Sequence, residues 1–161
     1  MSQIERYREL YEWEIDSNKK MLRMLASVPE ARRSDPLFNR ALCITVHLAA
    51  CRENWLSFML GKSANAVDWF VESATYELLQ PRYESLEKDW TAFLSEIDDI
   101  RLANDFSFVD GGETWAVNLG VQVEQLIGHA SYHRGQVALI VDLLGGEVVD
   151  TDYVEWALAQ G

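Results

Sequence analysis

The stretch QLIGHASYHRGQVALIVDLLG, residues 125–145, decides the fold that we expect for this chain. Its apolar residues recur at steps of three and four, which is the spacing of one face of an α-helix. The stretch therefore predicts one long helix, beginning near Leu119 and ending at Gly145, that turns one face toward a core. The inward positions are Leu126, Ala130, His133, Val137, Ile140 and Leu144.

Two of the chain's three histidines lie on this helix. His129 and His133 are four residues apart, so both imidazoles point the same way. Gln125 and Gln136 extend this polar row along a face that should be apolar. Unpaired buried polar groups cost about 1–3 kcal/mol each, so the row predicts partners or a functional site. Gly135 costs about 1 kcal/mol inside a helix, which suggests close approach by another helix or room beside His133.

The rest of the chain predicts three more amphipathic helices, over residues 4–27, 36–60 and about 78–100. Asp35-Pro36 is typical of a capped helix N-terminus, and Gly61 is typical of a left-handed residue just past a helix end. Between residues 104 and 118 the spacing changes to alternation around a turn, which predicts a small β-hairpin before the last helix. The last fifteen residues predict a short turn that packs back on the body.

This element order predicts an all-α fold, a four-helix bundle formed by one domain over residues 1–161. The helix at 36–60 follows a short connection and should be antiparallel to the first. The next two connections are long enough to cross the bundle, so the residues alone leave the order of the remaining helices open.

Composition excludes several classes of protein. Twenty-six acidic residues against fourteen basic ones give a net charge of −12, which argues against a nucleic-acid partner. No apolar run reaches the roughly eighteen residues of a membrane span, and the N-terminus is too polar for a signal peptide. Cys43 and Cys51 are eight apart on one helix, about 12 Å along its axis, so they cannot bridge each other. A soluble, cytoplasmic protein in a reducing compartment is expected.

His47, in the second helix, also falls on an inward or nearly inward position. Three imidazoles from two helices would suit zinc, nickel or iron(II) and would leave a coordination position open for a reaction. Gln125 and Gln136 would then fix the orientation of the rings. The structural alternative is that the histidines are hydrogen-bonded core residues, which is common for helical pairs at this spacing.

Other residues are weaker candidates. Cys43, His47 and Cys51 share a helix face, but the two thiols would lie about 12 Å apart, so both cysteines are interpreted as small core residues. Arg134 would either recognise an acidic substrate or form a structural ion pair. Trp55 would either line a substrate pocket, together with Trp69, or pack in the core. No residue stands out as a general base, and no catalytic residue is assigned.

Two segments, HASYHRGQVALIVDLLGG and VHLAACRENWL, resemble the DinB/YfiT-like metal-binding bundles, and the resemblance covers essentially the whole chain. It implies up-down-down-up connectivity, a homodimer, and a divalent metal held by His47, His129 and His133. Some relatives of this kind are transferases or isomerases that use a low-molecular-weight thiol.

The leading functional hypothesis is therefore a metal-dependent thiol S-transferase that acts on a small molecule. A metal-dependent hydrolase with a bound water as nucleophile is the second hypothesis. The third is a non-catalytic metal-binding or stress-related dimer with a vestigial site.

Overall fold

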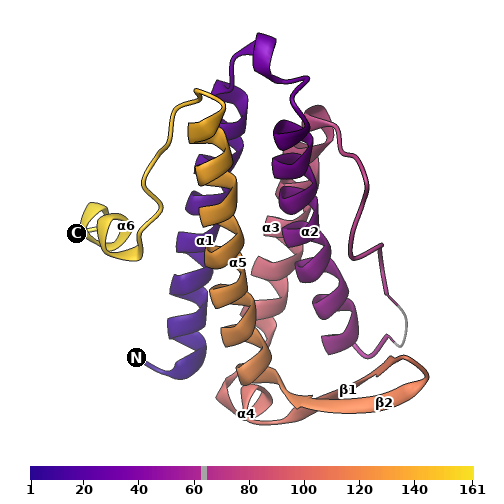
Figure 1. Cartoon of the computed structure of the whole chain (residues 1–161). Helices are drawn as coiled ribbons and strands as arrows, with labels where there is room; N and C mark the ends of the chain where they lie inside the picture. Colours follow the sequence, from indigo (N-terminus) through magenta and orange to yellow (C-terminus); the bar gives the residue numbers. More distant parts are fainter. Residues whose placement is uncertain (63–64) are drawn as a thin grey trace.

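The computed structural model describes residues 1–62 and 65–161, and it is mostly helical with one small hairpin, as the sequence predicts (Figure 1). The four long helices are α1 (Gln3–Ser27), α2 (Pro36–Met59), α3 (Leu79–Glu96) and α5 (Leu119–Leu143). The shorter elements are the 3-10 helices Glu30–Arg32 and Tyr76–Leu78, helices α4 (Asp99–Leu102) and α6 (Tyr153–Ala159), and strands β1 (Asp105–Asp110) and β2 (Glu113–Asn118).

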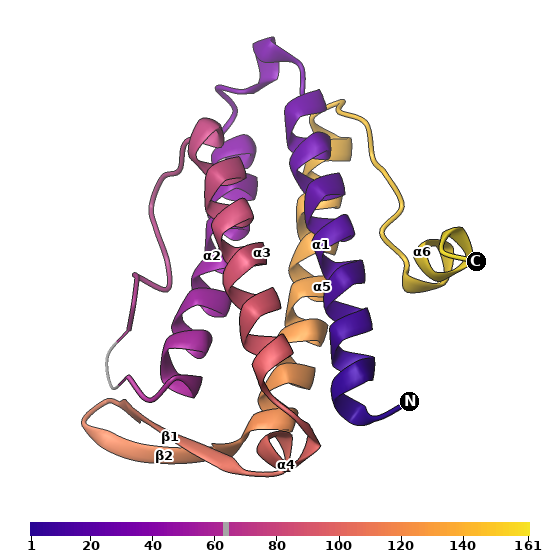
Figure 2. The same ribbon diagram turned by 180° about the vertical axis from the view of Figure 1, so that it is seen from behind.

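The four long helices surround one continuous hydrophobic core. Helix α5 packs against α1 and α2, and α3 packs against the same two helices from the opposite face (Figures 1 and 2). In Figure 1, α1 and α5 lead away from the end where the hairpin lies, whereas α2 and α3 lead toward it. This packing places the inner faces of α2 and α5, which carry the histidines, side by side.

Both ends of α2 form as their residues predict. The Asp35 side chain accepts a hydrogen bond of 2.9 Å from the backbone N–H of Leu37, which caps the helix. Gly61 has a φ of 84°, and its N–H bonds the carbonyl of Phe58, while the following N–H bonds that of Ser57. These bonds satisfy carbonyls that the helix end would otherwise leave free.

The third helix, predicted over about 78–100, ends earlier, at Glu96. The backbone of Ile97 is extended, with φ −102° and ψ 159°, so the helical hydrogen-bond ladder stops there. The side chain of Asp98 then accepts a bond of 2.8 Å from the N–H of Arg101 and starts the separate helix α4. A side-chain cap inside the predicted segment therefore divides it into two helices.

The predicted hairpin is confirmed. Strands β1 and β2 are antiparallel, and Asp110 pairs with Glu113 across a two-residue turn. The turn residues Gly111 and Gly112 have φ of 59° and 84°, values that favour glycine at both positions. Since β2 leads directly into α5 at Asn118, the hairpin sets where the histidine-bearing helix begins.

The C-terminal segment packs back on the body, as expected, through contacts with α1. The Tyr153 hydroxyl donates a hydrogen bond of 2.7 Å to Glu9, and the Trp13 indole N–H donates one of 2.9 Å to the carbonyl of Thr151. The Trp13 and Tyr153 rings also meet edge to face at 5.6 Å. The outer side of α1 is covered here by α6.

Candidate metal centre

The structure brings all three histidines together between α2 and α5. The ring centroid of His47 lies 5.2 Å from that of His129 and 5.1 Å from that of His133. The two rings on α5 are 4.4 Å apart, with only 3.1 Å between their Nε2 atoms. Packing of α5 against α2 thus gathers nitrogen atoms from positions more than eighty residues apart in the chain.

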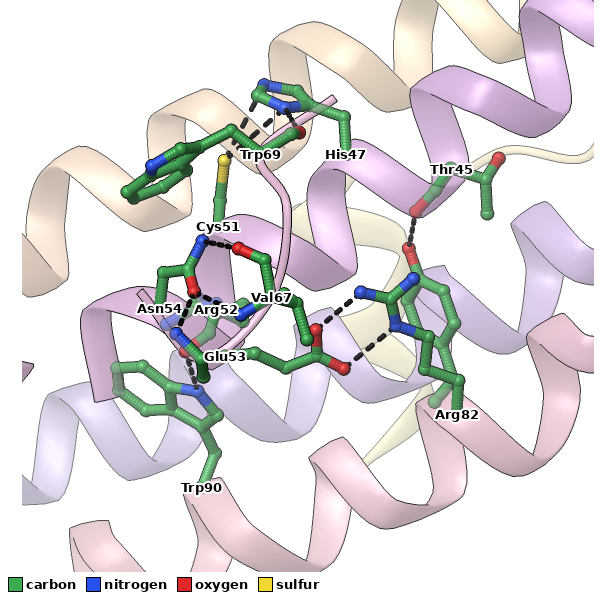
Figure 3. Close-up of polar contacts among 12 residues, drawn as sticks. Thr45, His47, Cys51, Arg52, Glu53, Asn54, Val67, Trp69, Arg82 and Trp90 are labelled. Carbon is green, nitrogen blue, oxygen red and sulfur yellow. Dashed lines mark hydrogen bonds and ion pairs between the residues drawn. The ribbon is translucent and has the colours of Figure 1, made fainter. Parts of the chain in front are cut away.

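Hydrogen bonds fix the tautomers of two of these rings. His47 Nδ1 lies 2.8 Å from the backbone carbonyl oxygen of Trp69 (Figure 3), and His133 Nδ1 lies 2.6 Å from Gln136 Oε1. Carbonyl oxygens only accept, so each Nδ1 carries the hydrogen and donates it. In the neutral rings, each Nε2 is therefore left with a free lone pair, which is the form that binds a metal ion.

The protein environment also favours the neutral form of the two rings on α5. Burial, followed by the neighbouring rings of His133 and His47 and the charge of Arg52, lowers the pKa of His129 to about 4. Burial likewise lowers the pKa of His133, although the hydrogen bond that its Nδ1–H donates to Gln136 Oε1 acts in the opposite direction. Because a metal ligand must be deprotonated, these shifts keep the nitrogen atoms available at neutral pH.

Cys51 lies beside the histidines, and its interpretation as a core residue alone needs correction. Its Sγ is 3.5 Å from His47 Nε2 (Figure 3). The ligand atoms of His47, Cys51 and His129 all lie within 4.8 Å of one another. The sequence interpretation rejects both cysteines as ligands because the thiols of Cys43 and Cys51 are too far apart to share an ion. The spacing of four residues from His47 to Cys51 was the signal that could have placed this thiol at the site. Burial raises the pKa of the Cys51 thiol to about 11.

The connection between α2 and α3 forms one side of the site. The Phe70 ring, 75% exposed, stacks on His47 at 4.5 Å and 9° between planes. The carbonyl of Trp69 in the same segment holds the His47 ring. The sequence interpretation gives this segment no role at the histidines and offers Trp69 only as a possible pocket residue beside Trp55, because the role of a backbone carbonyl leaves no trace in the side-chain pattern.

The two glutamines that are expected to orient the histidine rings, Gln125 and Gln136, make different contacts. Gln136 bonds His133, as described above. Gln125, however, is exposed and accepts a hydrogen bond of 3.0 Å from Gln122 Nε2 rather than from a histidine. Gly135 also has no close neighbour, because among the described residues nothing lies within 4 Å of the position that a Cβ would take. Close helix packing at Gly135 is therefore not seen within the described chain.

Arg134 is buried and bonds neutral side chains; the ion pair with a carboxylate that its sequence left open is not formed among the described residues. It is 2% exposed, and its guanidinium donates to Asn18 Oδ1 at 3.4 Å and to Ser131 Oγ at 3.3 Å. It also lies over the Trp13 ring, 5.3 Å from the centroid. This burial leaves the guanidinium tied to the bundle interior instead of open to an incoming substrate.

Trp55, proposed as a substrate contact, packs within an aromatic cluster that joins α2 to the hairpin and to the connection after α2. Its ring centroid lies 5.0 Å from that of Phe108, 6.0 Å from that of Trp69 and 6.2 Å from that of Phe106. These contacts account for the packing role of Trp55.

A buried ion pair lies next to the histidines and has no counterpart in the sequence interpretation. Arg52 Nε donates to Glu14 Oε1 at 2.9 Å, and a second bond joins Arg52 to the other oxygen of the same carboxylate. Glu14, Arg52 and His129 line a cavity of about 10 Å³, which has room for about one water. Wider cavities, of about 290 Å³ between α1 and α3 and about 380 Å³ between α2 and α3, include none of the histidines. The site is therefore identified by the donor atoms that meet there and not by the volume of a cavity.

The donor atoms fit a divalent ion. For tetrahedral zinc, bond lengths near 2.0–2.1 Å to nitrogen and 2.3 Å to sulfur place two nitrogens about 3.4 Å apart and a nitrogen and a sulfur about 3.5 Å apart. The observed separations are 3.1 Å between His129 and His133 and 3.5 Å between His47 and Cys51. Neutral imidazoles with a thiol suit zinc and its borderline neighbours in the first transition row.

Comparison with known proteins agrees with this arrangement. A family model described as the DinB family matches residues 1–160 of the 161-residue chain, a span that includes every residue of the site. No curated protein and no solved structure matches the chain.

Proposed function

Because the chain belongs to the DinB family, we propose that it is a divalent-metal-binding protein whose ligands are His47, His129 and His133. The observation that carries this proposal is the convergence of three imidazoles with ring centroids 4.4–5.2 Å apart. Two of the rings have Nδ1 occupied by a carbonyl acceptor, so their Nε2 lone pairs are free. The helix directions in Figure 1 support the up-down-down-up connectivity that this family assignment carries.

We further propose a metal-dependent enzyme of the thiol S-transferase type, acting on a small molecule with a low-molecular-weight thiol as co-substrate. When bound, the ion would supply Lewis acidity that favours the thiolate form of that thiol. Trp69 and Gln136 orient the rings of His47 and His133, and the stacked ring of Phe70 limits the access of water on one side. Glu14, the carboxylate beside His129, is engaged by Arg52, so activation would fall to the ion rather than to this residue as a base.

One alternative has a specific observation in its favour. The thiol of Cys51 lies 3.5 Å from His47 Nε2, and the ligand atoms of His47, Cys51 and His129 lie within 4.8 Å of one another, so Cys51 offers a protein ligand in addition to the histidines. A zinc site with four protein ligands is typically structural, whereas a catalytic site keeps one position open. A non-catalytic metal-binding protein is therefore the second candidate function.

Metal analysis of protein purified without an affinity tag tests the metal site. Close to one divalent ion per chain is expected, with zinc and nickel binding weakened by His129→Ala and by His133→Ala. Gln125→Ala is the matched control, because Gln125 lies on the same helix, is exposed and bonds only Gln122 in the described structure. Equally weak binding by the wild type and by His133→Ala would contradict the site.

Turnover of a model electrophile separates the functions. The metal-loaded protein is incubated with several biological thiols, and the transferase proposal expects product only when a thiol is present. Thiol-independent turnover of an ester or amide would favour hydrolysis instead. Stable metal binding without turnover across the panel would leave the non-catalytic function.

A homodimer in the cytoplasm, with neither nucleic acid nor membrane as a partner, completes the proposal. The outer face of α5 exposes Tyr132, Leu139 and Leu143, and Gly128 and Gly135 on this helix are open, which suits a second copy. Two free cysteines suit a reducing compartment. Among the described residues, no helix combines the length and apolar character that crossing a bilayer needs.

Sedimentation velocity tests the homodimer and should give the mass of a dimer; a monomer at all concentrations would contradict it.

A further inference from the structure

Cys51 is placed by the same helix that places His47. The two residues are one turn apart on α2, and the Cys51 Sγ lies 3.5 Å from His47 Nε2 and 3.7 Å from Nδ1. The thiol is 5% exposed, and the ring of His47 is its only recorded polar neighbour in the described chain. Packing alone does not require ring nitrogens beside a thiol, so the contact between Cys51 and His47 points to a chemical role for the thiol.

The orientation of His47 decides what that role is. Its Nδ1 is occupied by the carbonyl of Trp69, so Nε2 is the nitrogen that is left with a free lone pair. Nε2 is also the nitrogen nearer to the thiol of Cys51, and its distance of 3.5 Å matches the spacing of about 3.5 Å between nitrogen and sulfur around a tetrahedral zinc ion. The sulfur and the ligand nitrogens of His47 and His129 all lie within 4.8 Å of one another.

We propose that Cys51 is a fourth ligand, in its thiolate form, which closes the three-histidine site in the resting protein; this inference rests on the proposed metal site. Cys51 releases its thiol proton to solvent as the bond from sulfur to the ion forms. A set of three imidazoles and one thiolate suits zinc or cobalt(II).

A closed site has a consequence for the reaction. With four protein ligands, a small-molecule thiol would reach the ion by replacing Cys51, and the proton that this thiol gives up would pass to the sulfur of Cys51. The exchange is sulfur for sulfur and involves no change of oxidation state. Cys51 is thus an internal competitor of the co-substrate thiol, and the closed resting site disfavours a hydrolase that needs a bound water.

Cobalt(II) substitution tests the inference without depending on activity. Protein reduced with a phosphine, in buffer free of thiols, is loaded with cobalt(II), and its absorption spectrum is recorded. The wild type should show a near-ultraviolet sulfur-to-cobalt charge-transfer band together with visible d–d bands. Cys51→Ser and Cys51→Ala should lose the charge-transfer band and retain d–d bands, while circular dichroism confirms that the helices remain.

Cys43→Ser is the matched control, since Cys43 lies on the same helix two turns before Cys51 and should leave the spectrum unchanged. Addition of 2-mercaptoethanol should restore a charge-transfer band in Cys51→Ala at a lower thiol concentration than is needed to change the wild-type spectrum. A wild type that binds cobalt(II) without the band, or a band that persists in Cys51→Ala, would overturn the inference while leaving the histidine site intact. A wild type that binds no cobalt(II) would overturn the proposed metal site and the inference together.

Discussion

Charged residues are buried beside the histidines, and removing their charges from water is energetically unfavourable. Glu14 and Arg52 are only 2% and 4% exposed, so both charges have been removed from water. The pair is compensated by two hydrogen bonds between them and by the rings of Trp90 and Tyr11, which lie 4.5 Å and 5.4 Å from the guanidinium carbon. Each partner therefore depends on the other, because an unpaired buried charge is strongly unfavourable.

Glu14→Ala should lower the free energy of unfolding by about 3–5 kcal/mol, because it leaves the charge of Arg52 buried without a partner. Urea unfolding followed by circular dichroism measures the change. Asp16→Ala is the control: it breaks the partly exposed pair between Asp16 and Lys20 on the same helix and should cost no more than about 1 kcal/mol. The double substitution Glu14→Leu with Arg52→Met should recover most of the loss. Equal effects of Glu14→Ala and Asp16→Ala would contradict the importance of the pair.

Helical spacing predicts which face a residue occupies, but not which residues face it from other elements. The spacing of four placed His129 and His133 correctly on one face, and the inward position of His47 made their meeting a reasonable expectation. The same reasoning chose Gln125, which lies about 40° around the helix from His129, whereas Gln122 lies about 20° away on the other side and is the buried one. The sequence interpretation does not place Cys51 at the site because it considers this thiol only together with Cys43, as ligands of one shared ion.

At the scale of elements, α5 depends on how its first turn is joined to the hairpin. Asn118 follows β2 and precedes the helix, and its side-chain oxygen accepts a hydrogen bond of 3.2 Å from the N–H of Val121. Its side-chain nitrogen donates one of 2.9 Å to the carbonyl of Ala103, just after α4. One amide therefore caps the histidine-bearing helix and ties its start to the preceding turn.

Asn118→Ala should lower the free energy of unfolding by about 1.5 kcal/mol, within the range of about 0.5–2 kcal/mol for the loss of a helix cap. The bond to Ala103 is lost as well, so the upper half of that range is expected. Asp152→Ala provides the comparison, because Asp152 occupies the same position before α6 but makes no capping bond through its side chain. Urea unfolding of both variants measures the difference. A loss from Asp152→Ala as large as that from Asn118→Ala would show that the cap is not the cause.

Most element boundaries that depend on local chemistry are predictable from the sequence, although the cap at Asp98 that separates α3 from α4 is missed; segments set by tertiary contacts are not predictable in this way. Asp35-Pro36 and Gly61 gave the ends of α2, and the glycines at 111 and 112 gave the hairpin turn. The connection after α2 could not be derived in this way. Its course is fixed by side chains of α2 that bond its backbone, and such bonds have no signature in the connection's own sequence.

At the scale of the whole molecule, the site is assembled from α2, α5 and this connection. Asn54 of α2, fully buried, accepts hydrogen bonds from the N–H groups of Ala66 and Val67 and donates one to the carbonyl of Val67 (Figure 3). The chain then continues to Trp69, whose carbonyl holds the His47 ring. Asn54 therefore links the fold of the connection to the tautomer of His47, a proposed metal ligand.

Asn54→Ala should weaken zinc binding by about 10–100-fold, the usual effect of losing a contact that orients a ligand. The three hydrogen bonds that fix Ala66 and Val67 would be lost, so the Trp69 carbonyl would no longer be held against His47 Nδ1. A competition titration against a chromophoric chelator measures the affinity, and circular dichroism checks that the helices persist.

Asn39→Ala is the matched comparison, because Asn39 also lies on α2 and bonds the same connection, but at Glu72 and Ala74, beyond the segment that touches His47. Its effect on zinc affinity should be smaller than that of Asn54→Ala, since the Ala66–Val67 anchor next to Trp69 remains. If both variants bind zinc as tightly as the wild type, the Trp69 contact does not depend on these anchors. If Asn39→Ala weakens zinc binding more than Asn54→Ala does, the connection is held against His47 from its far end. The anchoring role assigned to Asn54 would then belong to Asn39.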